Sequence, residues 1–415
     1  MLKKTILSNG LYSILTGGIK LIGGLILLKL AVNQFGRENL IYLGQFNSIF
    51  FITSSIASAG LYAGIISLNR EMNKDIVFHS AFIHASKLIA FGLILLVILW
   101  VTLLNENSVF DMSLFFIASF LLVLFPLGEI LLGFINANNP PSATYITRSL
   151  ASVIAIAFGY FVLVVLENGS FLINTLYGLS LSLGTFIFLF SKKQLFTFNK
   201  AVFKVSVPER FYPYAKIFII SIIFLPTAKI FTREYILSQS SNFTASLWQS
   251  YLTISDAYTV IFSVFLTSFY IKYISGQKEV PIYSILRNIL PVLLPLLGMS
   301  FAFVFFIWPD VSLFLLNFNI DVDGDYRIFF VVADAMRFVS LLITYNFIVR
   351  EKAKVALVFE VVQSVSYVAF ISVGAHYWGV LGAAHGYAYC YFIYLLLGLG
   401  YVLKDKINNK YILKS

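Results

Sequence analysis

Long apolar runs, separated by short polar segments, extend along the whole chain. A helix of about 20 mostly apolar residues is long enough to cross the hydrocarbon core of a bilayer, so these runs predict membrane-spanning helices. The polar breaks divide the chain into about twelve such helices, over residues 8–34, 40–68, 79–104, 113–136, 144–166, 170–190, 214–238, 245–273, 284–307, 326–349, 355–376 and 380–402. The pattern therefore predicts an all-α integral membrane protein.

The longest basic connection, residues 191–213, lies between the sixth and seventh predicted helices. It separates an N-terminal lobe of six helices, 1–190, from a C-terminal lobe of six, 214–415, which ends in a short basic tail. An even number of helices in each half makes both halves enter the membrane from the same side, as parallel repeats do in transporters. We predict two lobes with a cavity between them, a symmetry inferred from topology because no strong residue-level repeat is visible.

The composition excludes a water-soluble protein. Hydrophobic residues make up 59% of the chain and charged residues only 12%, whereas soluble domains carry about 25% charged residues. The apolar run after Lys3 and Lys4 is too long for a secretory signal, so we interpret it as a retained first helix. One cysteine and four scattered histidines give neither a disulfide framework nor a zinc motif. We predict no metal site and no cofactor.

The lysines and arginines fix the predicted orientation. With the N-terminus in the cytoplasm, the inner segments hold most of the basic residues outside the spans, among them Lys74, Lys200, Arg350 and Lys404, while the outer loops hold only Arg37. This bias follows the positive-inside rule and places both termini in the cytoplasm. It also explains the net charge of +10 without a nucleic-acid partner, because the charges lie in loops rather than on one soluble face.

Several charged residues fall inside predicted spans. Each costs about 2.5 to 3.5 kcal/mol at the bilayer centre, and together they would rival the roughly 5 to 15 kcal/mol of net stability of a folded protein. Most of them must therefore face water or one another. They are Lys20, Lys29, Lys229, Arg233, Glu234, Asp256, Asp334 and Arg337.

Cations predominate among these residues, and a hydrated, positively charged cavity suits an anionic headgroup such as a diphosphate. Lys229 and Arg233 are four residues apart and share a helix face. Lys20 and Lys29 are nine apart, on opposite faces of a straight helix, although Gly17-Gly18 and Gly23-Gly24 would permit a bend. The cationic lining is the main functional prediction.

Structural explanations stand beside the functional ones. Lys29 lies near a helix end and could extend to the membrane surface. Asp334 and Arg337 are three residues apart and could neutralise each other. For Lys20 and Asp256, near the middle of the membrane, the functional interpretation is favoured.

Other features of the spans have both a structural and a functional interpretation. For Glu129 and Arg148, both toward the cytoplasmic side, a structural ion pair is favoured over a transport role. Tyr258, beside Asp256, could contact a sugar or simply pack. Prolines inside spans, at Pro126, Pro226, Pro291 and Pro295, predict kinks that are either static or used in motion.

An ordered set of short runs resembles the Wzx-type flippases of bacterial surface polysaccharides, in the branch that handles O-antigen and enterobacterial common antigen. The runs are Gly18-Ile19-Lys20, Lys29-Leu30-Ala31, Phe35-Gly36, Ser58-Ala59-Gly60-Leu61-Tyr62-Ala63-Gly64, Leu247-Trp248-Gln249, Ile254-Ser255-Asp256-Ala257-Tyr258, Ala333-Asp334-Ala335 and Gly379-Val380-Leu381-Gly382-Ala383-Ala384. The resemblance spans nearly the whole chain. It implies the V-shaped, two-lobe fold of the multidrug/oligosaccharidyl-lipid/polysaccharide (MOP) exporters, which includes the MATE transporters, in the bacterial inner membrane.

The resemblance also implies a substrate, an undecaprenyl-diphosphate-linked oligosaccharide moved from the cytoplasmic to the periplasmic leaflet for O-antigen and lipopolysaccharide biosynthesis. The implied partners are membrane lipids, the polysaccharide polymerase and a chain-length regulator. Lys20, Lys29, Arg233, Asp256 and Asp334 match the family pattern. Asn47 departs from it, since a basic residue is usual there, and Lys229 is an additional cation.

We therefore expect Lys20, Lys29, Lys229 and Arg233 to hold the diphosphate. Asp256 and Asp334 are the candidate cavity acids, with H⁺ or Na⁺ as a candidate coupling ion, and Arg337 and Tyr258 have secondary roles.

Rival functions fit the pattern less well. A MATE-like drug exporter of the same fold, exchanging organic cations for protons or sodium, would need a net acidic cavity. A membrane glycan polymerase or ligase would need a large outer loop with catalytic groups, but the longest outer loop, about Trp308 to Asp325, is short and acidic. We predict that the protein is not an enzyme.

Overall fold

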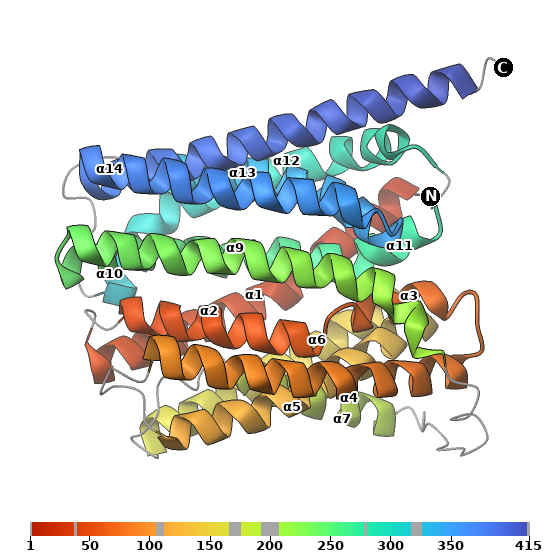
Figure 1. Cartoon of the computed structure of the whole chain (residues 1–415), viewed down its shortest axis with the longest axis horizontal. Coiled ribbons are helices and arrows are strands. Elements are labelled where there is room, and N and C mark those ends of the chain that lie inside the picture. The colour runs from red at the N-terminus through yellow and green to blue at the C-terminus, as the bar shows by residue number, and fades with distance from the viewer. Residues whose placement is uncertain are drawn as a thin grey trace. The chain divides into compact units, whose positions relative to one another are not determined.

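The computed structural model describes residues 2–36, 40–104, 112–165, 176–191, 207–277, 280–316 and 326–412, and within these ranges every regular element is a helix (Figure 1). The α-helices are α1 (Leu2–Phe35), α2 (Leu40–Ala57), α3 (Leu61–Leu68), α4 (Lys74–Leu99), α5 (Met112–Asn138), α6 (Pro141–Tyr160), α7 (Leu176–Ser191), α9 (Tyr212–Gln239), α10 (Asn242–Phe265), α11 (Ile271–Ser275), α12 (Ile282–Leu316), α13 (Tyr326–Val349) and α14 (Ala353–Ile412). Short π-helical turns, η2 (Trp100–Leu104), η3 (Phe161–Val165) and η6 (Leu266–Tyr270), follow α4, α6 and α10, and a 3-10 turn, η5 (Pro208–Phe211), precedes α9. This confirms the predicted all-α class.

In its described part, each of the twelve predicted spans contains mostly helical residues. Among the described residues, eight helices are long and apolar enough to cross a membrane, or nine if the bent pair Ile282–Pro291 and Leu293–Met299 counts as one span. The number is lower than twelve partly because α14 covers two predicted spans but is counted once. Its break lies at Trp378 and Gly379, whose backbone is not helical, at the boundary that the sequence predicts between 376 and 380.

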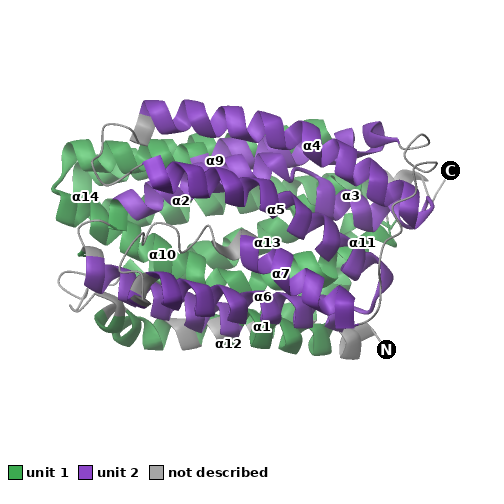
Figure 2. Cartoon of the chain, turned by 90° about the horizontal axis from the view of Figure 1, so that it is seen from below, with its two compact units in different colours: residues 1–17, 36–41, 227–415 green, residues 18–35, 42–226 purple. Residues whose placement is uncertain are grey.

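The chain forms two compact units (Figure 2). Unit 1 comprises Met1–Gly17, Gly36–Ile41 and Thr227–Ser415, and unit 2 comprises Gly18–Phe35 and Tyr42–Pro226. Two of the unit boundaries fall inside long helices, at Gly17-Gly18 in α1 and at Pro226 in α9, and a third lies in α2 between Ile41 and Tyr42. The first two are positions at which a helix is weakened, since Pro lacks the backbone donor and Gly adds conformational freedom. The division into lobes 1–190 and 214–415 stays a prediction, and most of the connection 191–213 lies outside the described residues.

Unit 2 has a core built from α3, α4, α5 and the start of α9. Leu61, Phe78, Phe134 and Phe211 are buried in it. The turn between α2 and α3 needs Gly60, which has φ +72° and whose backbone lies so close to Ala215 that a Cβ would collide with it. The end of the basic connection is therefore fixed against the first half of the chain.

Unit 1 contains the second half of α9 together with α10 to α14. The two limbs of α14 form a tight hairpin, because Gly374 lies against Gly382 and Gly386 against Phe370 with no room for side chains. Gly379 makes the reversal with φ +60°. The second limb thereby brings Tyr387 and Tyr391 into the core of unit 1, where both are fully buried.

Candidate functional site

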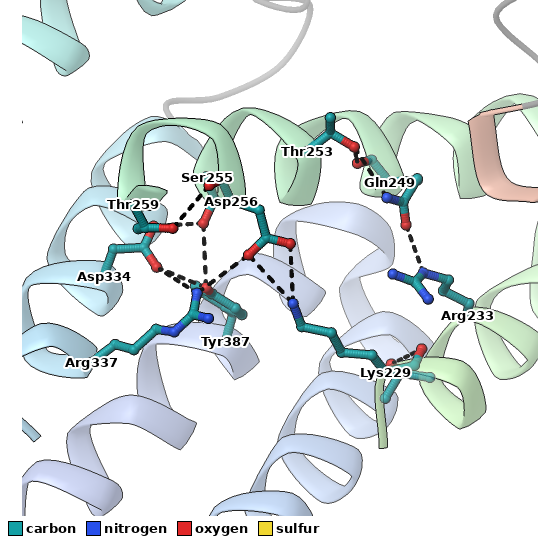
Figure 3. Close-up of polar contacts among 11 residues, drawn as sticks. Lys229, Arg233, Gln249, Thr253, Ser255, Asp256, Thr259, Asp334, Arg337 and Tyr387 are labelled. Carbon is teal, nitrogen blue, oxygen red and sulfur yellow. Dashed lines mark hydrogen bonds and ion pairs between the residues drawn. The ribbon is translucent and has the colours of Figure 1, made fainter. Parts of the chain in front are cut away.

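Three helices of unit 1 bring together a group of ionisable side chains, which we call the charged cluster: Lys229 of α9, Asp256 of α10, and Asp334 and Arg337 of α13 (Figure 3). Lys229 lies three residues after Pro226 in α9. Asp334 and Arg337 are three residues apart, so they share one face of α13. Residues more than 100 positions apart in the chain thus meet within one apolar unit.

The Asp334 carboxylate is fixed by hydroxyl groups. Ser255 Oγ donates to Oδ2 at 2.7 Å and Tyr387 OH donates to Oδ1 at 2.8 Å, and Tyr258 OH also donates to Oδ2. Arg337 Nη1 lies 3.7 Å from Oδ1. An ionised carboxylate accepts hydrogen bonds and can accept several at once, so it can satisfy all of these donors.

Aromatic rings enclose this part of the cluster. Trp308 and Phe301 pack edge-on against Tyr258, and Phe330 packs against Tyr387 with 4.9 Å between ring centroids. The Asp334 side chain consequently has no exposed surface. Because its donors are in place and water is excluded, Asp334 holds the geometry of the cluster.

Asp256 has the opposite environment. Its side chain is 47% exposed, and its carboxylate is bound by Lys229 Nζ, at 3.2 Å from Oδ2 and 3.4 Å from Oδ1, and by Arg337 Nη1, at 3.4 Å from Oδ1. Charge-assisted N–H···O bonds are usually about 2.7–2.9 Å. The two cations therefore hold Asp256 loosely, at an open face of the unit.

The two cations lie deeper than the carboxylate that they share. The side chain of Lys229 is 12% exposed and that of Arg337 is 19% exposed. Arg337 lies between the two acids, and its guanidinium also sits 5.7 Å from the ring centroid of Tyr391. Arg337 is thus held by the buried Asp334 and also contacts the half-exposed Asp256.

Arg233 lies one turn beyond Lys229 on α9 and is buried. Its Nε donates to Gln249 Oε1 at 2.6 Å, and Gln249 Nε2 in turn donates to Thr253 Oγ1 at 3.1 Å. This hydrogen bond ties the guanidinium to a neutral amide. Arg233 thus adds a third cation to this part of unit 1, beside Lys229 and Arg337.

Lys20 and Lys29 belong to unit 2, on the second part of α1, and both are partly buried. Lys20 and Arg148 are the charges that act on Glu129, and Arg148 also lies 5.7 Å from the ring centroid of Tyr62. Tyr62 OH accepts a hydrogen bond from Asn136 Nδ2 at 2.6 Å. The predicted site residues therefore fall into two groups, one in each unit.

Sequence reasoning missed the roles of Ser255, Tyr387 and Gln249. Ser255 and Gln249 were visible only as parts of family-like runs, and Tyr387 only as one of many tyrosines. Ser255 and Tyr258 are three residues apart and share one face of α10, so the sequence could have suggested that both contact the same partner. Nothing in the sequence indicates that Tyr387, from the far limb of the α14 hairpin, completes the shell of Asp334.

In the described part of the chain, no three histidine, cysteine, aspartate or glutamate side chains come together as a metal site would require. The charged cluster has the chemistry of a salt-bridge network, which can bind an ion or a charged group through exchange of partners. It contains no arrangement of nucleophile and base.

No known family model matches the chain. No curated protein matches it either. Solved structures do: an outward-facing multidrug resistance MATE family transporter of the MOP superfamily aligns with a TM-score of 0.66 and 14% identity, over 100% of this chain and 97% of that one. A MATE transporter from Vibrio cholerae aligns with a TM-score of 0.64 and 11% identity, over 97% and 96%.

A MOP superfamily transporter from Pyrococcus furiosus, described as having a binding pocket of reverse polarity that suggests a different function, aligns with a TM-score of 0.66 and 13% identity, over 98% of this chain and 97% of that one. At these identities the likeness concerns the fold alone. The chain has the two-lobe helical fold of MOP superfamily transporters along its whole length.

Proposed function

We propose that the protein is a flippase that moves an undecaprenyl-diphosphate-linked oligosaccharide from the cytoplasmic to the periplasmic leaflet of a bacterial inner membrane. The substrate repeat unit belongs to O-antigen or a related surface glycan. The diphosphate contacts cationic side chains, the sugars pass through a hydrated interior, and the polyprenyl chain stays in lipid. Access alternates between the two sides as the lobes move.

One observation carries this proposal: cationic side chains lie deep inside an apolar helical unit. Lys229 and Arg337 meet at the half-exposed Asp256, and Arg233 is buried one turn beyond Lys229. Cations inside membrane-spanning helices are costly and mark ion or substrate pathways. A diphosphate diester is an anionic group that such cations can bind.

The fold supports a transport role for this cluster. Structures of this fold include a protein described as a multidrug resistance MATE family transporter, and the Pyrococcus furiosus protein is described as having a pocket of reverse polarity. A fold that tolerates pockets of different polarity can serve substrates of different charge. The cations of unit 1 favour an anionic substrate.

A MATE-like exchange of organic cations is the second candidate. The half-exposed carboxylate of Asp256 favours it, because an exposed acid can attract a cation, and several structures of the same fold are multidrug transporters. In that function Asp256 would bind the cargo or the coupling ion, H⁺ or Na⁺. The excess of positive charge around Asp256 is the reason that we rank it second.

Transport in proteoliposomes separates the two candidates. We expect Lys229→Gln to lower the initial rate of translocation of a fluorescent lipid-linked oligosaccharide at least tenfold, since a hydrogen bond to a charged group contributes about 1.5–3 kcal/mol and about 1.4 kcal/mol corresponds to a factor of ten. Lys216→Gln is the matched control, because Lys216 is an exposed lysine of the same helix. Its rate should stay within about twofold of the unchanged protein.

The remaining cations are tested by a Lys20→Ala, Arg233→Ala double variant in the same assay, which should also be impaired. Normal transport by Lys229→Gln and by the double variant would reject the cationic assignment. Uptake of an organic cation, with no movement of the labelled lipid, would establish the second candidate instead.

A further inference from the structure

Asp256 and Asp334 are bound to the same arginine, but they differ in how firmly they are held. Asp334 accepts three hydroxyl donors and has no exposed side-chain surface. Asp256 is 47% exposed, and within the described residues its carboxylate receives hydrogen bonds from Lys229 and Arg337 only. One acid is therefore fixed, and the other is free to turn away from its partners by rotation of its side chain.

The position of Asp256 is also the position from which an external anion would approach. Its carboxylate lies in front of Lys229 and Arg337, whose side chains are 12% and 19% exposed. Any phosphate that reached these two cations from the open face would have to take the place of the carboxylate. The contacts to be replaced are 3.2 to 3.4 Å long, longer than the usual 2.7–2.9 Å or so of a charge-assisted hydrogen bond.

We propose that Asp256 is an internal competitor for the anion site: its carboxylate stands in for a phosphate on Lys229 and Arg337, and it yields this place when a phosphate binds. This rests on the proposed function, because the phosphate is taken to be the headgroup of the transported lipid. The competition keeps the two cations neutralised between substrates. The Asp256 carboxylate also rebinds Lys229 and Arg337 when the product leaves, and this promotes release of the phosphate.

The fixed acid makes this exchange feasible. When Asp256 turns away, Arg337 keeps Asp334 as its counter-ion, so the pair of cations never stands alone in the membrane interior. When the Asp256 contact is lost, Lys229, Arg337 and Asp334 together carry a net charge of +1. One phosphate of a diphosphate diester, which carries a single negative charge, matches that value.

The test is binding of inorganic pyrophosphate to the full chain in detergent, measured by calorimetry at one pH and one salt concentration. We expect Asp256→Asn, which removes the competing charge with little change of shape, to tighten binding about tenfold, or about 1.4 kcal/mol. The matched control is Asp310→Asn, which removes an exposed acid of α12 in the same unit and should leave the affinity for pyrophosphate within about twofold. Tighter binding of pyrophosphate in both variants would overturn the proposal, because it would show that the loss of any negative charge raises the affinity.

A double-variant cycle ties the effect to the lysine. In a Lys229→Gln background, Asp256→Asn should change pyrophosphate affinity by no more than about twofold, since the contact for which the carboxylate competes is gone. If the tenfold gain persists there, Asp256 acts elsewhere and the proposal fails. Should Asp256→Asn not fold, Asp256→Ser removes the same charge and replaces it in the cycle.

Transport of the labelled lipid distinguishes this proposal from the proposed function. We expect Asp256→Asn to bind pyrophosphate more tightly and yet turn over the lipid more slowly, because release is impaired. If the unchanged protein neither binds pyrophosphate nor moves the lipid, the proposed function falls. If it does both while Asp256→Asn leaves the affinity within about twofold, only the competitor role falls.

Discussion

Two aspartates of one salt-bridge network illustrate how far a residue's surroundings, rather than its type, determine its role. Asp334 is enclosed by Ser255, Tyr258 and Tyr387, whereas Asp256, among the described residues, is bound by two cations at an open face. The first is satisfied as a buried acceptor, and the second can exchange partners. We therefore assign stability to Asp334 and exchange to Asp256.

Asp334→Asn should destabilise the protein. An amide presents an NH2 donor to a shell of hydroxyl donors, and each buried polar group left without a partner costs about 1–3 kcal/mol. We expect a clear fall in the midpoint of thermal unfolding in detergent. Thr259→Val, one turn from Asp256 on α10, is the control and should shift the midpoint much less, because the Thr259 hydroxyl bonds only to a helix carbonyl of its own helix. An unchanged midpoint for Asp334→Asn would contradict the buried hydroxyl shell.

At the level of elements, glycines decide how two pairs of segments approach each other. Gly60 allows the α2–α3 turn to lie directly on the backbone at Ala215, and Gly379 reverses α14 into a hairpin. Both adopt positive φ, which other residues rarely adopt. The first contact fixes the start of α9, and the second delivers Tyr387 to Asp334.

Gly60→Ala should destabilise unit 2. The new methyl group would collide with backbone atoms of Tyr214 and Ala215, which cannot move aside as a side chain can, and a non-glycine residue with strained φ costs about 1–3 kcal/mol by itself. We expect poorer yield of folded protein and a lower unfolding midpoint. Gly24→Ala is the matched control in the same unit, because a Cβ at Gly24 meets nothing within 4 Å. Equal behaviour of the two variants would refute the close approach.

On the scale of the whole molecule, charge is distributed in two ways. Most lysines and arginines lie in segments outside the predicted spans, where they set orientation, and a minority lie inside the spans, among them Lys229 and Arg337 of the charged cluster. Orientation is a property of the whole chain, because it depends on the sum over all loops. The predicted arrangement has both ends in the cytoplasm.

Labelling with a membrane-impermeant maleimide tests this orientation. The native chain should give little background labelling, since its single cysteine, Cys390, is fully buried. Gln239→Cys, at the predicted outer end of α9, should react in intact cells, whereas Glu71→Cys, in a predicted inner segment, should react only after permeabilisation; both positions are exposed. Labelling in the reverse order would show that the chain is inverted relative to our prediction.

The positions of the helices could be predicted from the sequence because each depends on a local property. An apolar run of sufficient length must form a helix in lipid, where unpaired backbone groups are costly, and polar breaks mark its ends. The break between 376 and 380 was predicted for this reason and occurs at Trp378 and Gly379. The charged residues that belong to the candidate site could be found in the same way, because a charge inside an apolar run stands out.

The partners of those charges were decided only by tertiary structure. Asp334 was expected to pair with Arg337 or to act as a cavity acid, but it also binds Ser255 from α10 and Tyr387 from the second limb of α14. Hydrogen bonds act over about 3 Å in space irrespective of distance along the chain, so such pairings follow from helix packing and leave no pattern in the sequence. The sequence by itself determined an all-helical membrane protein with cations inside it, whereas the packing of α9, α10, α13 and α14 decided which acid is fixed and which stays open to exchange.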